Sequence, residues 1–154
     1  MGYSILLLMH ILAGMAWVGG ALVLEATLFV ARRAGDPVEV DRVMRSQAWA
    51  DTWLAVPAPL LVVATGAAMV ALNGAWTFTQ AWVLLAIGLV VAYELIAMTV
   101  GARLYRRITE ARESGALDAA AHARTMRAWG RLSGLLLALL LIVVGLMVFK
   151  PGIG

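Results

Sequence analysis

The stretch that decides the fold class is residues 9–20, which reads MHILAGMAWVGG. It lies inside a hydrophobic run that starts at Tyr3 and meets no cationic residue until Arg32. Such a run is long enough to cross a bilayer as a helix. His10 is therefore a polar, metal-competent side chain inside a membrane span, where ionisable residues are expensive and are by default functional candidates.

The polar and small residues of this run share one face of the expected helix. At 100° per residue, Gly14 and Trp17 fall on the same face as His10. Ala21 completes this face, and Glu25 lies about 60° round from His10. The rest of the helix surface is aliphatic. We expect the His10 face to look into protein and the aliphatic remainder to face lipid.

The composition is that of a polytopic membrane protein. Of 154 residues, 63% are hydrophobic and 14% are charged, and the mean hydropathy is +0.91. We therefore expect a single transmembrane domain over residues 1–154. The absence of cysteine excludes disulfides, iron–sulfur clusters and thiolate zinc sites. The two histidines are too few for a multi-histidine metal centre within one chain.

Four hydrophobic spans predict an all-α fold, a bundle of four transmembrane helices. Each span is near or above the roughly 20 residues that a helix needs to cross the hydrocarbon core. The spans cover residues 3–31, 53–72, 81–102 and 131–149. Pro57 and Pro59 lie early in the second span and are expected to kink or loosen it.

The segment between the first two spans is expected to form a short amphipathic helix. Asp36-Pro37 is a helix-start signal, because an N-cap residue is followed by a proline at the first helical position. Apolar or amide side chains then recur at helical spacing, and a helix of this pattern is expected to lie on the membrane surface. The recurring residues are Val40, Val43, Met44 and Gln47.

A helical hairpin is expected between the third and fourth spans, over residues 103–131. The first helix should run on through Arg103 to a break at Ser114-Gly115, and Asp118 should cap a second helix that continues into the fourth span. At the start of that span, residues 130, 134 and 138 form a small-xxx-small seam of two glycines and an alanine. The seam predicts close packing against a neighbouring helix or, alternatively, a dimer motif.

The distribution of positive charge gives the expected orientation. Residues 32–51 and 103–131 hold eleven of the twelve Lys and Arg residues, and residues 73–80 hold none. By the positive-inside rule, both basic segments are cytoplasmic and both termini lie outside the inner (cytoplasmic) membrane. Because the arginines lie beside the spans, membrane topology explains the net charge of +3 better than nucleic-acid binding does.

Besides His10, three ionisable side chains lie within or beside the spans. Glu94 is expected near mid-membrane, Glu25 at the cytoplasmic end of the first span, and Lys150 at the outer end of the fourth. Each group also has a purely structural interpretation. His10 then donates a hydrogen bond to a carbonyl, and Glu94 is a protonated or paired carboxyl. Glu25 pairs with an arginine, and Lys150 anchors a helix end.

Three segments of the chain carry recognisable short patterns. The first is Leu8-Met9-His10, with Trp17 seven residues on and Gly20 three beyond that. The second is an aliphatic run over residues 84–94 that ends Ala92-Tyr93-Glu94, and the third is residues 143–151, VVGLMVFKP. Together they resemble HemJ-type protoporphyrinogen oxidases and the related CopD-like four-helix membrane proteins, whose pattern ends the second run Tyr-His and closes with an aliphatic run into Lys-Pro.

This resemblance implies haem b held in the bundle, with His10 as the metal ligand. Gly14 leaves room for a planar ring, and Trp17 and Tyr93 are the aromatic residues of the same cofactor site. Lys150 matches the family's functional lysine, and Glu94 stands where its second histidine would be. Lys150 and Glu94 are therefore the candidate catalytic residues, and bis-histidine ligation within one chain is not possible.

Three functions stay open at this point. The first is a haem b-binding membrane oxidoreductase or electron-transfer protein, acting with a membrane redox partner or as a homo-oligomer. The second is a CopD-like copper permease with Met9 and His10 as entry ligands, although no line of Met or His residues crosses the membrane. The third is a non-enzymatic scaffold subunit. The lipid bilayer is the expected surrounding in each case.

Overall fold

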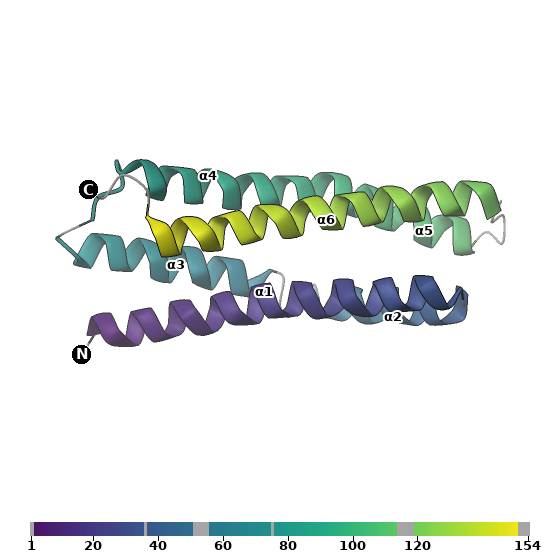
Figure 1. Ribbon diagram of the computed structural model, residues 1–154, viewed down its shortest axis with the longest axis horizontal. Helices are drawn as coiled ribbons and strands as arrows, with labels where there is room; N and C mark the ends of the chain where they lie inside the picture. The colour runs from purple at the N-terminus through teal and green to yellow at the C-terminus, as the bar shows by residue number, and fades with distance from the viewer. Residues whose placement is uncertain (1, 36, 51–55, 75, 114–118, 151–154) are drawn as a thin grey trace. The chain divides into compact units, whose positions relative to one another are not determined.

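The computed structural model describes residues 2–35, 37–50, 56–74, 76–113 and 119–150, and the regular elements within them are all helices (Figure 1). The chain divides into two units, Met1–Leu84 and Leu85–Gly154. The elements are α1 (Gly2–Ala34), α2 (Pro37–Ala50), α3 (Pro57–Leu72), α4 (Ala81–Ile96), the π-helical segment η2 (Ala97–Gly101), α5 (Ala102–Glu113) and α6 (Ala119–Phe149).

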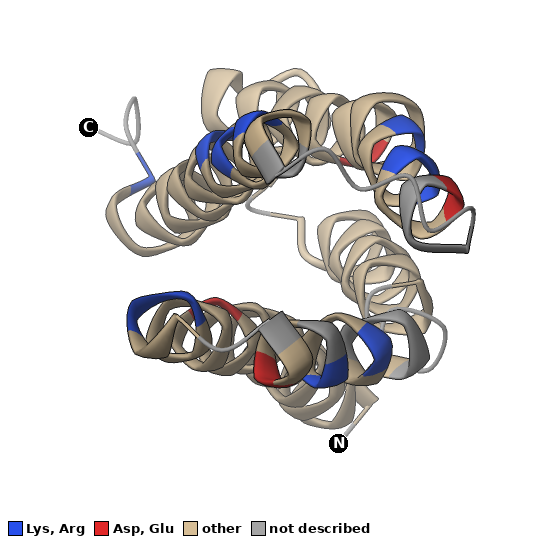
Figure 2. Ribbon diagram, turned by 90° about the vertical axis from the view of Figure 1, so that its right-hand side faces the viewer, with Lys and Arg blue, Asp and Glu red and all other residues tan. Residues whose placement is uncertain are grey.

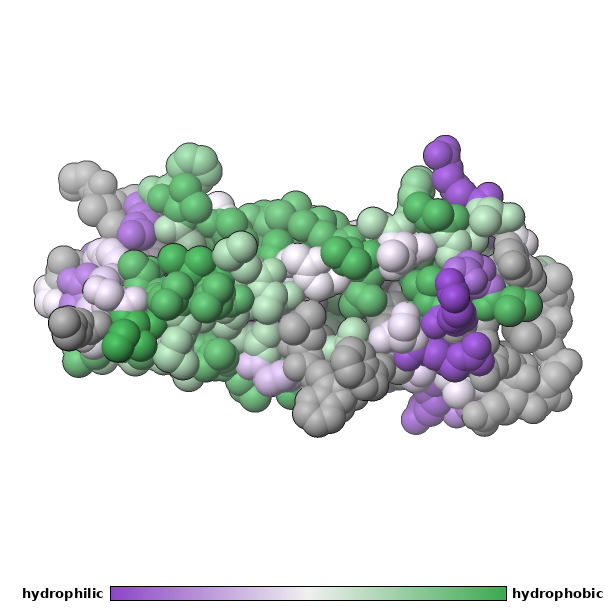
Figure 3. Space-filling view, turned by 90° about the horizontal axis from the view of Figure 1, so that it is seen from below, coloured by the Kyte–Doolittle hydropathy of each residue, from purple (hydrophilic) through white to green (hydrophobic). Residues whose placement is uncertain are grey.

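Three of the described helical stretches are long and apolar enough to cross a membrane. They are Gly2–Ala34, Ala81–Glu110 and Ala123–Phe149. The fourth apolar helix, α3, has 16 residues and is shorter. The all-α prediction is confirmed, and the first part of the predicted span 53–72 lies outside the described residues. The outward surface of the helices is largely hydrophobic, as Figure 3 shows for one face.

In the first unit, α1 packs against α3 and α2, which lie beside its first and second halves respectively (Figure 1). Trp17 and Leu28 of α1 are buried, as are Val62 of α3 and Met44 of α2. The predicted amphipathic helix is therefore confirmed as a helix, and Met44 of its apolar stripe is buried where α2 packs on α1. Its place on the membrane surface stays a prediction.

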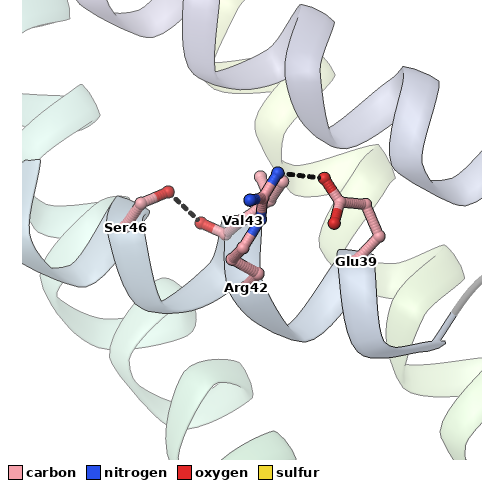
Figure 4. A network of polar contacts seen from close by, with 4 residues as sticks. All are labelled: Glu39, Arg42, Val43 and Ser46. Atoms are coloured by element: carbon pink, nitrogen blue, oxygen red, sulfur yellow. Dashed lines mark hydrogen bonds and ion pairs between the residues drawn. The ribbon is translucent and has the colours of Figure 1, made fainter.

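The outer side of α2 carries local polar contacts (Figure 4). Arg42 forms an ion pair with Glu39, with Nη2 and Oε1 2.6 Å apart, and the Ser46 hydroxyl donates to the Val43 carbonyl at 2.8 Å. The ion pair is exposed and separated by three residues on one helix, so it contributes little to stability. Its role is to keep this side of α2 polar.

The two prolines of the second span start a helix instead of kinking one. α3 begins at Pro57, with Val56 as its N-cap residue. In the first turn of a helix the backbone N–H has no intrahelical acceptor, so a proline there sacrifices no hydrogen bond. The prediction that Pro57 and Pro59 kink or loosen the span was therefore wrong.

In the second unit, α4 continues through η2 into α5 without a break. The Ala102 N–H donates to the Ala97 carbonyl, the wide hydrogen bond of a π-helix. The predicted continuation past Arg103 is confirmed, and α5 packs against α6, as the predicted hairpin requires. The break at Ser114-Gly115 and the Asp118 cap lie outside the described residues.

The small-residue seam at the start of the fourth span has no close neighbour at two of its residues within the second unit. A Cβ at Gly134 would have no atom within 4 Å, and Ala138 is exposed. Packing of the seam against a helix of the first unit stays a prediction. Small side chains permit close approach, but they do not by themselves supply a partner. The alternative, a seam between two chains, stays a prediction.

Candidate functional site

His10 is held by α3 through its Nδ1 atom. Nδ1 lies 2.9 Å from the carbonyl oxygen of Val62 and 3.1 Å from Oγ1 of Thr65. A carbonyl oxygen can only accept, so Nδ1 carries the ring proton and donates. This assignment rests on the hydrogen-bond network rather than on observed hydrogens. In the neutral imidazole, Nε2 then holds the lone pair, and Nε2 has no hydrogen bond within the described residues.

Thr65 completes a short relay of hydrogen bonds behind the imidazole. Its hydroxyl oxygen lies 2.6 Å from the Leu61 carbonyl and 3.2 Å from that of Val62. The single hydroxyl proton is directed to Leu61 by the shorter distance, so the oxygen is left to accept from His10. The side chain is buried, with the residue only 4% exposed. A buried polar group of this kind is stabilising because its hydrogen bonds are satisfied.

Gly66 provides the surface on which the imidazole lies. A Cβ at this position would be 3.1 Å from Cε1 and 3.5 Å from Nδ1 of His10. The first distance is tighter than ordinary van der Waals contact, so any larger residue would push against a ring that two hydrogen bonds hold in place. The role of Gly66 here is close approach of side chain to backbone rather than an unusual backbone angle.

The rest of the predicted cofactor face on α1 is partly covered. Trp17 is buried at 3% exposure, Gly14 is half-buried, and a Cβ at Gly14 would have no atom within 4 Å. On the face predicted from helical periodicity, the Trp17 indole is therefore covered by protein, whereas the position beside Gly14 is open. The described residues contain no group of three or more His, Cys, Asp or Glu side chains that could hold a metal ion.

The other predicted site residues belong to the second unit. Tyr93 and Glu94 are half-buried on α4, and Glu94 lies three residues before η2. Its Oε1 is shielded from solvent and has no hydrogen-bond partner among the described residues. Lys150 directly follows α6, with φ of 41° and its N–H bonded to the Leu146 carbonyl at 2.9 Å. That backbone conformation ends the helix with a left-handed cap, which is uncommon for a side chain other than glycine.

Residues 4–151 match the family described as "Predicted integral membrane protein (DUF2269)". The chain belongs to this family. It is therefore a multi-pass integral membrane protein in contact with the lipid bilayer. Searches of curated proteins and of solved structures gave no match.

The sequence interpretation of this DUF2269 protein missed Thr65 and Gly66. A signal for Thr65 was present, because it is the only hydrogen-bonding side chain in α3. Depth was a second signal: His10 is eight residues after the start of α1 and Thr65 is eight residues before Asn73, the C-cap of α3. Because the two helices are antiparallel, the start of α1 and the end of α3 lie on the same side. Both residues are therefore about 12 Å along their helices from that side. No comparable signal pointed to Gly66.

Glu25 was considered as a partner for an arginine. Arg32, two turns further along α1, interacts electrostatically with Glu25. Within the described residues no ion pair of 4 Å or less joins the two, and Nε and Nη2 of Arg32 have no hydrogen-bond partner there. Glu25 and Arg32 therefore interact over a distance along the helix and do not form a direct contact.

Proposed function

We propose that this protein binds haem b through His10 and acts as a membrane oxidoreductase or electron-transfer protein. The Nδ1–H of His10 donates to the Val62 carbonyl, as the structural interpretation of His10 predicted, and the observation that supports a ligand role is Nε2, which keeps its lone pair and has no hydrogen bond within the described residues. A histidine that ligates a metal through one nitrogen nearly always donates the other N–H to a carbonyl or carboxylate. The same hydrogen bond leaves Nε2 as the atom that would ligate the iron, and the chain has no cysteine thiolate to compete with it.

The residues present can supply one protein ligand to a haem iron. His10 offers one lone pair, and the open position beside Gly14 leaves space on the same face of α1. The resemblance of residues 8–20, 84–94 and 143–151 to HemJ-type proteins supports the same cofactor. When bound, haem supplies one-electron transfer. The chain's own contributions are ligation by His10, orientation by Val62 and Thr65, and exclusion of water by the apolar helix surfaces.

The iron should be five-coordinate or carry a weak sixth ligand. His122 is the one other histidine, and its place near the start of α6 is about 40 Å along that helix from Phe149. In the proposed topology that puts His122 at the opposite side of the membrane from His10. Lys150, which matches the lysine of the family pattern, and Glu94, which stands in place of its second histidine, are the proposed catalytic groups.

The test of the function is the anaerobic absorbance spectrum of the freshly purified protein, oxidised and then reduced. We expect a Soret band of high-spin haem that shifts when carbon monoxide is added to the reduced protein. A colourless protein that purifies with copper would support the CopD-like permease instead. A colourless protein without metal would contradict both and leave the scaffold function.

We also propose four transmembrane spans with both termini outside the inner membrane. The proposal is supported by the concentration of eleven of twelve cationic residues in residues 32–51 and 103–131. Reporter fusions after Gly35, Gly74 and Gly115 should read cytoplasmic, external and cytoplasmic in turn. An external signal at Gly115 would overturn this orientation, and an internal signal at Gly74 would show that α3 does not cross.

A further inference from the structure

Two contacts fix how α5 and α6 lie against each other in the second unit. A Cβ at Gly101 would be 3.8 Å from the Leu132 side chain, and the rings of Tyr105 and Trp129 are 6.5 Å apart. In two antiparallel helices, the residue numbers of each facing pair have a nearly constant sum. Here the two sums are 233 and 234. The same register brings Arg103 level with Arg131.

The register also pairs the next arginines along the hairpin. Arg127 of α6 is level with Arg106 and Arg107 of α5, one turn beyond the first pair. Residues 102–131 contain seven arginines and three acidic residues, Glu110, Glu113 and Asp118, and the structure describes the side chains of six of these arginines and of Glu110. All six guanidinium-bearing residues are exposed. Figure 2 looks at the hairpin from its connecting end, with the cationic residues in blue.

The arginines lie away from the contact between the two helices. Arg103 and Arg107 are each two residues from Tyr105, which places them about 160° round α5 from the contact. Arg127 stands in the same relation to Trp129 on α6. The cations therefore form a belt around the outside of the hairpin rather than a pocket between its helices. Arg106 has a carboxylate nearby, Glu110 at 3.5 Å, and that pair is exposed.

The belt starts where the apolar surface stops. Arg103 directly follows the apolar run that begins at Ala81, and Arg131 precedes the apolar run to Phe149. Four residues separate Arg103 from Arg107, about 6 Å along the helix. That is about the thickness of one headgroup layer, since a bilayer of 40–45 Å holds a hydrocarbon core of roughly 30 Å. Both levels of arginines therefore fit into a single layer of headgroups.

A buried donor lies at the same depth. Trp129 is 8% exposed, and its Nε1–H has no hydrogen-bond partner among the described residues. It lies between the level of Arg103 and Arg131 and that of Arg107 and Arg127. Because the Trp129 Nε1–H is buried, the donors that a phosphodiester outside the hairpin can reach are the exposed guanidinium groups of the two levels.

We propose that the α5–α6 hairpin binds the headgroups of anionic phospholipids through the Arg103–Arg131 and Arg107–Arg127 levels. Charge complementarity and continuity with the apolar spans favour lipid over a soluble acidic partner, because lipid headgroups surround the hairpin and reach a belt from all sides. Juxtamembrane basic residues contribute about 1 kcal/mol each at an anionic surface, or about fivefold in affinity. Removing two should therefore weaken binding about 30-fold.

The test compares labelled phosphatidylglycerol with labelled phosphatidylcholine on the full-length protein in zwitterionic vesicles. The double variant Arg103→Gln/Arg131→Gln should lose about 30-fold in preference for phosphatidylglycerol. The matched control Arg42→Gln/Arg45→Gln removes the same charge from α2 and should keep most of the preference. Arg103→Lys/Arg131→Lys, which keeps the charge, should retain most of it too, and helix content by circular dichroism should be the same in all.

Three results would overturn the proposal. An Arg103→Gln/Arg131→Gln protein that keeps the full preference would show that the hairpin does not bind the headgroup. An equal loss in the α2 control would show that only net charge matters. If soluble polyglutamate or RNA displaces phosphatidylglycerol from the wild type, but phosphatidylglycerol vesicles do not displace either of them, the belt serves an acidic macromolecule instead.

Discussion

Replacing His10 with alanine should give a protein that folds but purifies without haem. The substitution removes the ligand atom Nε2 and leaves no neutral nitrogen ligand on the same face of α1. The cost to the fold should be small, about 1 kcal/mol, because Thr65 still donates to the Leu61 carbonyl after the imidazole is gone. The measurement is the ratio of Soret to protein absorbance, with helix content recorded on the same sample.

The matched control is His122→Ala, which removes the other histidine and should retain haem. Free imidazole added to His10→Ala should restore part of the Soret band, because the space vacated by the side chain lies next to the proposed iron position. A His10→Ala protein that still purifies with full haem would show that His10 is not the haem ligand. Loss of haem from both variants would point to a general folding defect instead.

Replacing Gly66 with valine should disturb the site without touching any ligand. A Cβ already falls 3.1 Å from Cε1 of His10, and the two further methyl groups of valine leave the ring no room. Overpacking costs about 1–3 kcal/mol. Displacing the ring loses a hydrogen bond worth about 1 kcal/mol, so we expect a total loss of roughly 2–4 kcal/mol in the free energy of unfolding. Haem retention should fall with it.

Gly19→Val is the control for this prediction. Gly19 is also in an apolar helix of the first unit, but a Cβ there would have no atom within 4 Å. The difference in the free energy of unfolding between the two variants therefore isolates the contact with His10. Gly66→Ala should fall between wild type and Gly66→Val. Equal stability of Gly66→Val and Gly19→Val would show that the imidazole does not lie on Gly66.

Much of the helical architecture could be predicted because the signals were local. Hydrophobic length marked the long spans, and the Asp36-Pro37 signal marked the start of α2. The errors came where a local signal has two physical outcomes. A proline at residue 57 fits a kink or a first turn equally well. The π-helix at Ala97–Gly101 left no sequence signal, because its residues are ordinary helix residues.

The candidate site was predicted in part, from the periodicity of a single helix. That periodicity placed His10 and Trp17 on one face, and Trp17 is indeed buried. It could not show that α3 supplies the partners of His10, because the neighbour of a helix is a property of tertiary packing. The roles of Gly14, Tyr93, Glu94 and Lys150 in cofactor binding or catalysis stay predictions.

The shortness of α3 has a consequence for the membrane itself. Its 16 residues rise about 24 Å, whereas the hydrocarbon core of a typical bilayer is roughly 30 Å thick. A helix that is too short creates hydrophobic mismatch, which is relieved by local thinning of the bilayer or by flanking protein, at a fraction of a kcal/mol per Å. In the proposed four-span topology, the lipid boundary is therefore thinner at α3 than at the neighbouring α1, whose 33 residues rise about 50 Å. Such asymmetry favours lipids with shorter acyl chains next to α3.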